Sequence, residues 1–302
     1  MRHCLLACAL LLATSAFADS YTQTKYPVVL VHGFLGSTTL FGVDYFYGIL
    51  GELRSGGAEV YVAQVTASNS TAVRGEDLIA QLDTLKALTG ATKFNLIGHS
   101  HGGMTVRYVA SVRPDLVASV TTVGAPHTGS PVADAIATAA PPGSPQRAFL
   151  ASFVDALGAF IQLLAGSANR QDSVAALGSL STGGAAAFNA LHPEGQPTVA
   201  CGQGPGVVNG VRYYSMGGTS PATNFFDVSD GLMVAGSLFF GSEQNDGLVG
   251  RCASHWGLVL RDDYGWNHLD EINQFLGLRG LFSASPPSVY RAHANRLKNL
   301  GL

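Results

Sequence analysis

Charged residues are scarce in this sequence. Asp, Glu, Lys and Arg make up 12% of its 302 residues, against ~25% in average soluble proteins. This scarcity excludes intrinsic disorder, because disordered chains combine high charge with few apolar residues. Basic residues are not in excess either: the formal net charge is −3, which argues against a nucleic-acid-binding protein. Hydrophobic residues are abundant, at 47%, so the sequence predicts a compact protein with a large core.

Apolar runs long enough to span a membrane are absent. The run from Cys4 to Ala13 is far shorter than the ~20 residues that a spanning helix needs. Arg2 precedes it, and Ala16-Phe17-Ala18 follows it as a small-x-small cleavage site, which together are typical of a secretory signal peptide. We therefore predict that residues 1–18 are cleaved during export through the periplasm to the extracellular medium.

Cysteine is rare as well. Only Cys201 and Cys252 lie outside the predicted signal peptide, and in an oxidising compartment they are expected to form one disulfide. The alternative is a pair of buried thiols. A bridge that closes a loop of about 50 residues would stabilise the fold by roughly 4 kcal/mol in the chain-entropy model.

Short apolar runs alternate with helical patterns in the rest of the chain. Strands are predicted at 27–31, 59–65, 93–97 and 117–123, and helices at 73–88 and from the 98–102 turn to Arg113. Strands that alternate with helices form parallel sheets, so the fold class is α/β with a mostly parallel central sheet flanked by helices. No internal repeat, charge run or long polar linker divides the chain, and we expect one catalytic domain over 19–302.

The strongest chemical signal is Gly98-His99-Ser100-His101-Gly102. It matches the G-x-S-x-G nucleophile elbow, directly after a predicted strand and before a predicted helix. The alternative is an ordinary glycine-rich turn. In this context we predict that Ser100 is a nucleophile, held in a strained turn at the carboxyl edge of the sheet.

A nucleophilic serine for acyl transfer needs donors for the oxyanion. One is the amide after the nucleophile, which belongs to His101. The other is expected from the loop after an earlier strand, where His32-Gly33-Phe34-Leu35-Gly36 lies. We assign the backbone amides of Phe34 and His101.

A base and its carboxylate should follow the serine in the order acid, histidine. The base predicted here is His268, which lies late in the chain just before a predicted helix; His255 is the rival. The acid predicted is Asp246, which follows an apolar segment and precedes His268. Asp227 and Asp230 remain competitors, since sequence spacing ranks them only weakly.

Four segments of the chain resemble the secreted triacylglycerol lipases of Pseudomonas and Burkholderia. They are Tyr26–Gly33, Asn95–Gly103, Asn245–Gly250 and Asn267–Glu271, and the closing Val289–Arg296 is similar too. The resemblance extends from about Tyr21 to the end. It implies a reduced α/β-hydrolase fold with Ser100, Asp246 and His268 as the triad, the oxyanion donors named above, and the Cys201–Cys252 disulfide.

The resemblance also implies a cofactor, one structural calcium ion. The matching ligands are the carboxylates of Asp227 and Asp270 and the backbone carbonyls of Gln274 and Leu278. Calcium prefers such oxygen ligands. Asp270 is two residues beyond His268, so an ion there would hold the loop of the base in place.

A helical lid is expected at about 143–166. This segment carries an apolar stripe of Phe149, Leu150, Phe153, Val154, Leu157, Phe160, Ile161 and Leu164. A core helix would show the same stripe. A lid reading is favoured because the family has a lid here, which would cover the site in water and expose its apolar face at an oil surface.

The resulting expectation is a secreted lipase that acts on long-chain triacylglycerols at the oil–water interface. A carboxylesterase for soluble esters, or a non-catalytic hydrolase-fold binding protein, are the alternatives. We expect a monomer whose partners are its lipid substrate and a lipase-specific foldase, with no nucleic acid and no transmembrane segment.

Overall fold

The computed structural model describes residues 19–40, 42–137 and 171–302, together with positions 144, 147, 150, 151 and 155. The predicted signal peptide lies outside these residues, and so does most of the predicted lid. Within them, no single helix is both long and apolar enough to cross a membrane; one bent pair of short helices, Ser173–Leu180 with Thr182–Leu191, passes on length and composition only.

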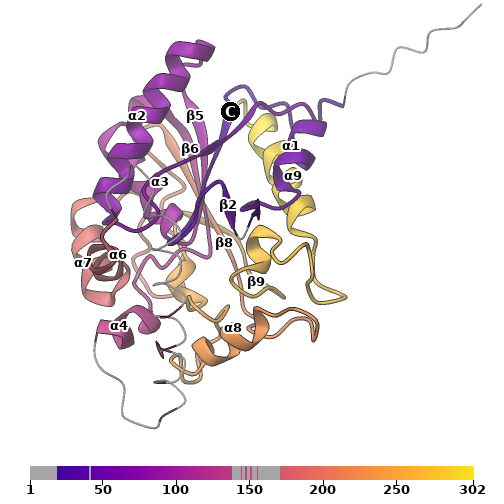
Figure 1. The fold of residues 1–302 in the computed structure, drawn as a ribbon. Helices are drawn as coiled ribbons and strands as arrows, with labels where there is room; N and C mark the ends of the chain where they lie inside the picture. The colour runs from indigo at the N-terminus through magenta and orange to yellow at the C-terminus, as the bar shows by residue number, and fades with distance from the viewer. Residues whose placement is uncertain are drawn as a thin grey trace, which may run out of the picture.

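A seven-stranded sheet forms the centre of the molecule (Figure 1). Its order is β4-β1-β5-β6-β8, and both β9 and the short β7 pair with β8. All pairings are parallel except that of β7. The strands are β1 (Val28–Val31), β4 (Val60–Ala63), β5 (Phe94–His99), β6 (Val117–Val123), β7 (Val207–Val208), β8 (Val211–Gly218) and β9 (Leu258–Tyr264).

Helices cover both faces of this sheet (Figure 1). One face is covered by α2 (Thr71–Thr89) and α3 (His101–Val112), the other by α1 (Ile49–Ser55) and α9 (Pro286–Asn299). The remaining elements are α4 (Pro131–Ala137), α6 (Ser173–Leu180), α7 (Thr182–Leu191), α8 (Asp230–Ser237), the hairpin β2 (Thr39–Leu40) and β3 (Val43–Asp44), and 3-10 turns at Pro114–Leu116, Cys252–Ser254 and Asp270–Ile272.

The alternation of side chains in β1 explains the two-sided core. Val29 and Val31 pack into the cluster beneath α2 and α3, while Val28 and Leu30 pack into the cluster beneath α1 and α9. All four are fully buried. A continuous run of β-branched and aliphatic residues is required here because both faces of a parallel strand are covered.

The predicted elements are confirmed with small shifts at their ends. Strand β6 has the predicted bounds, and β5 extends two residues further to His99. Helix α2 begins at Thr71, two residues before the predicted start, because the Ser70 side chain caps it by accepting from the amide of Val73. The α/β fold class is therefore confirmed.

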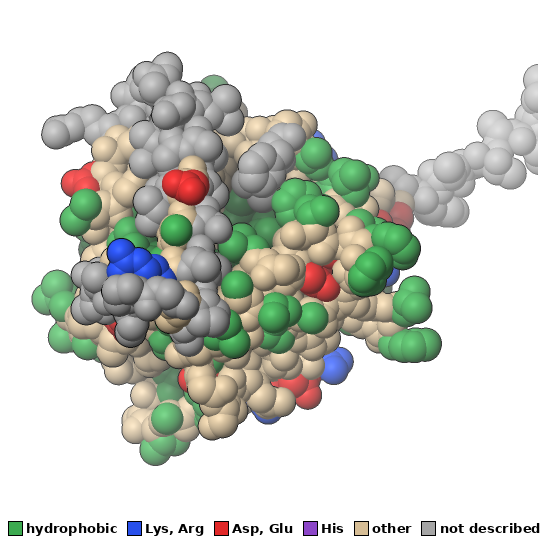
Figure 2. All heavy atoms as spheres, turned by 60° about the horizontal axis from the view of Figure 1, so that its bottom comes forward, with side chains coloured by type: hydrophobic (Ala, Val, Ile, Leu, Met, Phe, Trp, Pro, Cys, Tyr) green, Lys and Arg blue, Asp and Glu red, His purple; other side chains and the backbone are tan. Residues whose placement is uncertain are grey.

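The parallel register brings several strand ends to one edge. Val31 pairs with Gly98, Gly98 with Thr122, and Val123 with Met216, so β1, β5, β6 and β8 all end on the same side. Helices α4 and α8 lie on this side in Figure 1, and Figure 2 looks onto it from below. Hydrophobic side chains gather on this face.

Candidate active site

Ser100 occupies the turn between β5 and α3. Its backbone has φ 56° and ψ −127°, a conformation that residues other than glycine rarely adopt. Its amide donates a 2.9 Å hydrogen bond to the carbonyl oxygen of Val123, which fixes the turn against β6. The side chain lines a cavity. Strain at such a position is typical of functional residues.

The two glycines of the motif are required by close backbone contacts. A Cβ atom on Gly98 would lie 2.2 Å from the carbonyl oxygen of Gly102, and one on Gly102 would lie 2.3 Å from that of Val31. Backbone atoms cannot rotate away as a flexible side chain can, so any other residue would displace the helix. The glycines thus allow α3 to begin directly against β5 and β1.

The imidazole of His268 lies against the carboxylate of Asp246. Nδ1 of His268 donates to Oδ2 of Asp246 over 2.8 Å, and the His268 amide donates to the Asp246 carbonyl oxygen over 2.9 Å. Oδ1 of Asp246 accepts from the amides of Leu248 and Val249 at 2.8 and 2.7 Å. Because Nδ1 carries the proton, Nε2 is the basic nitrogen. His268 lines the same cavity as Ser100, so the structure brings the predicted triad together.

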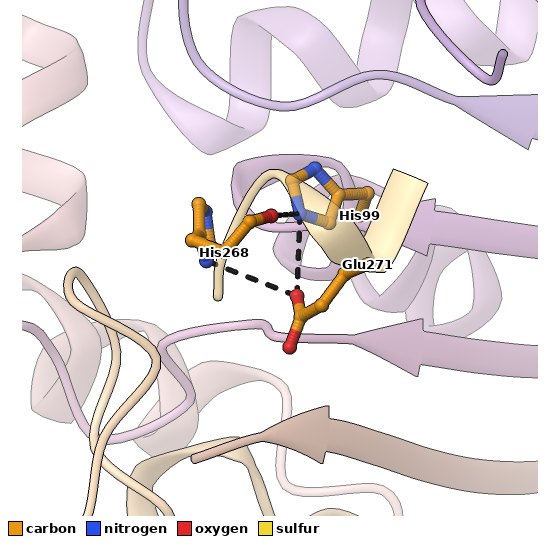
Figure 3. Close-up of side chains that lie close together, drawn as sticks. All are labelled: His99, His268 and Glu271. Carbon is orange, nitrogen blue, oxygen red and sulfur yellow. Dashed lines mark hydrogen bonds and ion pairs between the residues drawn. The ribbon is translucent and has the colours of Figure 1, made fainter. Parts of the chain in front are cut away.

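Two further side chains beside His268 were not predicted from sequence. Oε2 of Glu271 lies 3.8 Å from Nδ1 of His268 and 3.3 Å from Nε2 of His99 (Figure 3). Burial raises the pKa of Glu271 well above its usual range, and the charge of Asp246 raises it further. Burial also lowers the pKa of His99 well below its usual value. The lowered pKa leaves the His99 imidazole neutral at neutral pH, so its contact with Glu271 is not an ion pair.

His99, His268 and Glu271 also satisfy the spacing of a metal site, since their ligand atoms lie within 4.8 Å of one another. Their hydrogen bonds argue against that role. Nε2 of His99 donates to the His268 carbonyl oxygen over 2.9 Å, and Nδ1 of His268 donates to Asp246. Both nitrogens carry protons, whereas a metal needs their lone pairs. The cluster is a hydrogen-bonded part of the active site.

The loop after β1 carries Phe34, which lines the cavity with Ser100. Arg74 anchors this loop, because its Nη2 donates a hydrogen bond to the His32 carbonyl oxygen over 2.6 Å. Burial lowers the pKa of Arg74 to about 10, so it stays charged at neutral pH. His101, the second predicted amide donor, begins α3, where the helix dipole favours negative charge.

The cavity beside Ser100 has a volume of about 140 Å³. Its described lining is mainly apolar and includes Leu35, Pro126, Val132, Ala133, Ile136, Leu177, Leu180, Leu248, Val249 and Leu269. An apolar lining with a few convergent polar groups is typical of a site for a hydrocarbon-bearing ligand. The arrangement can hold an acyl chain beside the serine.

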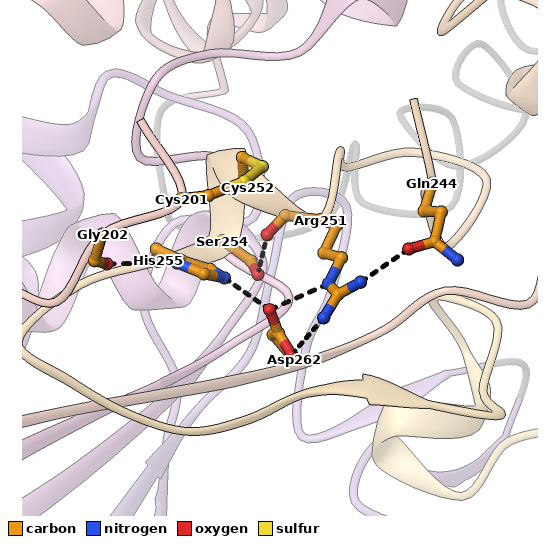
Figure 4. Close-up of a disulfide and its surroundings, with 8 residues drawn as sticks. All are labelled: Cys201, Gly202, Gln244, Arg251, Cys252, Ser254, His255 and Asp262. Carbon is orange, nitrogen blue, oxygen red and sulfur yellow. Dashed lines mark hydrogen bonds and ion pairs between the residues drawn. A yellow bond between two sulfur atoms is a disulfide. The ribbon is translucent and has the colours of Figure 1, made fainter. Parts of the chain in front are cut away.

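The rival base His255 belongs to a different part of the molecule (Figure 4). Its Nε2 donates to Oδ2 of Asp262 over 2.8 Å, beside the disulfide that joins Cys201 and Cys252. The Cα atoms of these cysteines are 4.4 Å apart, so the predicted bridge is present. His255 lines a separate pocket with both cysteines and is not the partner of Ser100.

The competing acids are occupied elsewhere. Oδ2 of Asp230 accepts from the amides of Thr223 and Asn224, both at 2.7 Å. Oδ1 of Asp227 accepts from the amide and the hydroxyl of Ser229 at 2.8 and 2.7 Å. Neither aspartate forms a hydrogen bond with the His268 side chain, whereas Asp246 does.

Asp227 and Asp270, the carboxylates implied for calcium, are both buried. Oδ2 of Asp227 and Oδ1 of Asp270 accept no hydrogen bond from any described residue. Burial raises the pKa of Asp270 to about 7, and the charge of Asp227 contributes to the rise. Two buried carboxylate oxygens without donors are unfavourable unless a cation compensates them. These residues fit a hard, oxygen-seeking cation such as Ca²⁺.

The fold and the site define an α/β hydrolase. The chain matches the family described as alpha/beta hydrolase fold over residues 26–249. Among solved structures it resembles the mature form of the Bacillus licheniformis lipase BlEst2, with a TM-score of 0.62 at 19% identity and coverage of 91% of this chain and 93% of that one. At this low identity, the likeness supports the fold alone.

Relatives that align over most of their length identify the family within this class. The chain is 55% identical to a triacylglycerol lipase of Vibrio cholerae, with 96% of this chain and 94% of the relative covered. It is 42% identical to a triacylglycerol lipase of Burkholderia plantarii, with 94% and 89% covered. The chain belongs to the bacterial triacylglycerol lipases within the α/β-hydrolase family, and it is an ester hydrolase. The resemblance drawn from the sequence is confirmed.

Proposed function

We propose that this lipase hydrolyses the ester bonds of long-chain triacylglycerols by a Ser-His-Asp acyl-enzyme mechanism. The observation that carries the proposal is the hydrogen bond from His268 Nδ1 to Asp246 Oδ2, with His268 lining the same cavity as the strained Ser100. The substrate class is supported by the names of the Vibrio cholerae and Burkholderia plantarii relatives.

In the first half-reaction, Nε2 of His268 removes the proton from Ser100 Oγ as this oxygen attacks the ester carbonyl. Asp246 stabilises the resulting imidazolium through Nδ1. The backbone amides of Phe34 and His101 donate hydrogen bonds to the negatively charged oxygen of the tetrahedral intermediate. Collapse of the intermediate breaks the ester bond, and the imidazolium gives its proton to the departing alcohol.

In the second half-reaction, water replaces the alcohol. His268 Nε2 removes a proton from the water as it attacks the acyl-enzyme carbonyl, and the same two amides hold the oxyanion. The proton then returns to Ser100 Oγ as the fatty acid leaves. During both steps the apolar lining next to Ser100 would hold the acyl chain away from water.

We also propose that Asp227 and Asp270, with the backbone carbonyls of Gln274 and Leu278, hold one structural calcium ion. The bound ion would neutralise the two buried carboxylates and supply no catalytic group. Each aspartate has a buried carboxylate oxygen that accepts no hydrogen bond from the described residues, which supports this proposal. Because Asp270 follows His268 by two residues, the ligands would fix the loop that carries the base.

Action at an oil–water interface is supported by exposed apolar side chains on two loops. Five of them, Phe225, Phe226, Val228, Leu281 and Phe282, are each at least 76% exposed. The loops adjoin, because the Asn224 side chain donates to the Arg279 carbonyl oxygen over 3.0 Å. Exposed aromatic and aliphatic residues of this kind are typical of surfaces that meet lipid. The proposed lid at 143–166 would open at the same interface.

We further propose that the protein is exported through the periplasm, that a foldase assists its folding, and that the mature form is a monomer. The signal-like pattern of residues 1–18 and the Cys201–Cys252 disulfide support an oxidising destination. Resemblance to the Pseudomonas and Burkholderia lipases supports the foldase.

The test compares wild type with Ser100→Ala on emulsified triolein and on a soluble short-chain ester, below and above its solubility limit. The proposal expects wild type to prefer the emulsion and to gain rate sharply above the solubility limit, and Ser100→Ala to lose both activities. Cleavage of the soluble ester alone would instead assign a carboxylesterase. Cleavage of neither by folded wild-type protein would assign a non-catalytic binding protein.

A further inference from the structure

A continuous chain of buried hydrogen bonds runs beside Ser100, through side chains that line the same cavity. The amide of Gly33 donates to Oη of Tyr45 over 2.9 Å, and Oη of Tyr45 lies 2.8 Å from Nδ1 of His99. Nε2 of His99 lies 2.9 Å from the carbonyl oxygen of His268. Tyr45 is 4% exposed and His99 1% exposed, so water does not compete for these bonds.

The direction of every proton in this chain follows from its two ends. The carbonyl oxygen of His268 can only accept, so Nε2 of His99 carries the proton. His99 is neutral because burial lowers its pKa, and its Nδ1 is then an acceptor. The hydroxyl of Tyr45 must therefore donate to Nδ1, which leaves its oxygen free to accept from the Gly33 amide. Each donor of the chain thus has an acceptor, and Nε2 of His99 also lies 3.3 Å from Oε2 of Glu271.

The two ends of the chain belong to the two groups that act on the reacting carbonyl. Gly33 directly precedes Phe34, the proposed oxyanion donor, and His268 is the proposed base. His99 directly precedes Ser100. Tyr45 itself comes from the segment between β3 and α1. Four segments of the chain are thus joined around the nucleophile.

We propose that Tyr45 and His99 are positioning residues that hold the oxyanion loop and the base loop at a fixed separation on either side of Ser100. The inference rests on the proposed acyl-enzyme function. It assigns to these residues no contact with the reacting atoms. Their effect is geometric, since a displacement of about 1 Å in a reacting group can lower the rate about 10²-fold.

Other contacts keep the loops folded when the chain of bonds is cut. Arg74 donates to the His32 carbonyl oxygen, and the amide of Leu35 donates to Ala67 over 2.9 Å. The His268 amide remains bonded to Asp246. Loss of the Tyr45 hydroxyl should therefore loosen the spacing of the two loops without unfolding them.

The experiment measures kcat and KM of Tyr45→Phe on a soluble short-chain ester, with Tyr290→Phe as the matched control. Tyr290 is a fully buried tyrosine in the same core cluster as Tyr45, and its hydroxyl has no hydrogen-bond partner among the described residues. We expect Tyr45→Phe to lower kcat by about 10- to 100-fold with KM within about 3-fold of wild type. Tyr290→Phe should leave both constants within about 2-fold.

A second pair of variants tests the role of His99. His99→Gln keeps an N–H that can donate to the His268 carbonyl, whereas His99→Leu removes both donor and acceptor, so Gln should retain the larger kcat. In the double variant Tyr45→Phe/His99→Leu, kcat should fall little below that of His99→Leu alone, because both changes break the same chain.

Three results would overturn the inference: an unchanged kcat in Tyr45→Phe, an equal loss in Tyr290→Phe, or a rise in KM at unchanged kcat, which would make Tyr45 a substrate-binding residue. Failure of the acyl-enzyme function is distinguishable from these, because wild type itself would then be inactive, or Ser100→Ala as active as wild type.

Discussion

Oε2 of Glu271 lies 3.8 Å from Nδ1 of His268. The imidazole therefore has a second carboxyl group within reach, besides the Asp246 carboxylate that accepts its proton at 2.8 Å. Glu271 is held in place by the amide of Gly218, which donates to its Oε1 over 2.8 Å. Burial, and the charge of Asp246 beside it, raise the pKa of Glu271 well above its usual range.

This relationship predicts that Glu271 substitutes in part for Asp246. In Asp246→Ala the part of the Glu271 pKa rise that comes from the Asp246 charge is gone, although burial still raises this pKa, so Glu271 ionises more readily next to the imidazolium. We expect kcat to fall by about 10²-fold, less than the ~10⁴-fold typical when a triad acid is lost. The double variant Asp246→Ala/Glu271→Gln should reach the larger loss, while Glu271→Gln alone stays within about 10-fold of wild type. A ~10⁴-fold loss in Asp246→Ala alone would show that Glu271 does not substitute.

The close backbone approach at the elbow predicts that Gly102→Ala is strongly destabilising. Its Cβ would meet the Val31 carbonyl oxygen at 2.3 Å, and overpacking of this kind costs about 1–3 kcal/mol or more in the free energy of unfolding. Gly51 in α1 is the matched control, because a Cβ there meets nothing within 4 Å. Gly51→Ala should be neutral or stabilising by up to about 1 kcal/mol. Urea denaturation of both variants measures the difference, and equal stabilities would contradict the close contact.

Calcium removal is predicted to lower thermal stability. If the free ion is at about 100 times its Kd, it stabilises the fold by about 2.7 kcal/mol, which corresponds to a Tm shift of about 4 °C in a chain of this size. EGTA should cause this shift in wild type. Asp227→Asn should already have a lowered Tm and should not respond further, whereas the exposed Asp83→Asn should respond as wild type does. A wild-type Tm that is indifferent to EGTA and to added calcium would contradict the site.

Acid is predicted to destabilise the fold through buried neutral histidines. Burial lowers the pKa of His293 to about 3, whereas the unfolded chain has the ordinary value of about 6.5. Between these values the unfolded state binds one more proton, so the stability contributed by this group is present above pH ~6.5 and is lost as the pH falls toward 3. The expected slope is about 1.4 kcal/mol per pH unit.

The variant His293→Gln isolates this contribution. Without a titrating side chain at this position, the unfolding free energy should fall less steeply between pH 4 and 6. The difference in slope should correspond to the uptake of about one proton on unfolding. Denaturant titrations at several pH values measure the slope. A slope equal to that of wild type would show that His293 is not buried as a neutral group.

Much of the fold could be predicted because its signals are local. The run Val28–Val31 is apolar at every position, as a strand covered on both faces must be, and G-x-S-x-G marks the following elbow from five adjacent residues. The start of α2 was missed by two residues because the Ser70 cap, not the apolar pattern, sets it. Local patterns thus predict elements well and their ends less well.

The hydrogen-bond network around the triad could not be predicted in this way. Tyr45 and His99 are 54 positions apart, and His99 and His268 169 apart. Nothing in the segment around Tyr45 distinguishes it from an ordinary core tyrosine until the fold brings it to β5. The choice between His268 and His255 likewise depends on where the fold places each side chain. Spacing in the sequence ranks the two histidines but does not decide between them. The calcium ligands came from resemblance alone, since two are backbone carbonyls and leave no mark in the side chains.

We propose that His268 and Asp246 make Ser100 nucleophilic. The most direct measurement is labelling by an alkyl phosphonate ester, with the adduct located by mass spectrometry of the peptides. We expect one phosphonyl group per chain, on Ser100, with activity lost in step, and labelling slowed by several orders of magnitude in His268→Ala. Labelling at another residue, or at an unchanged rate in folded His268→Ala, would contradict it.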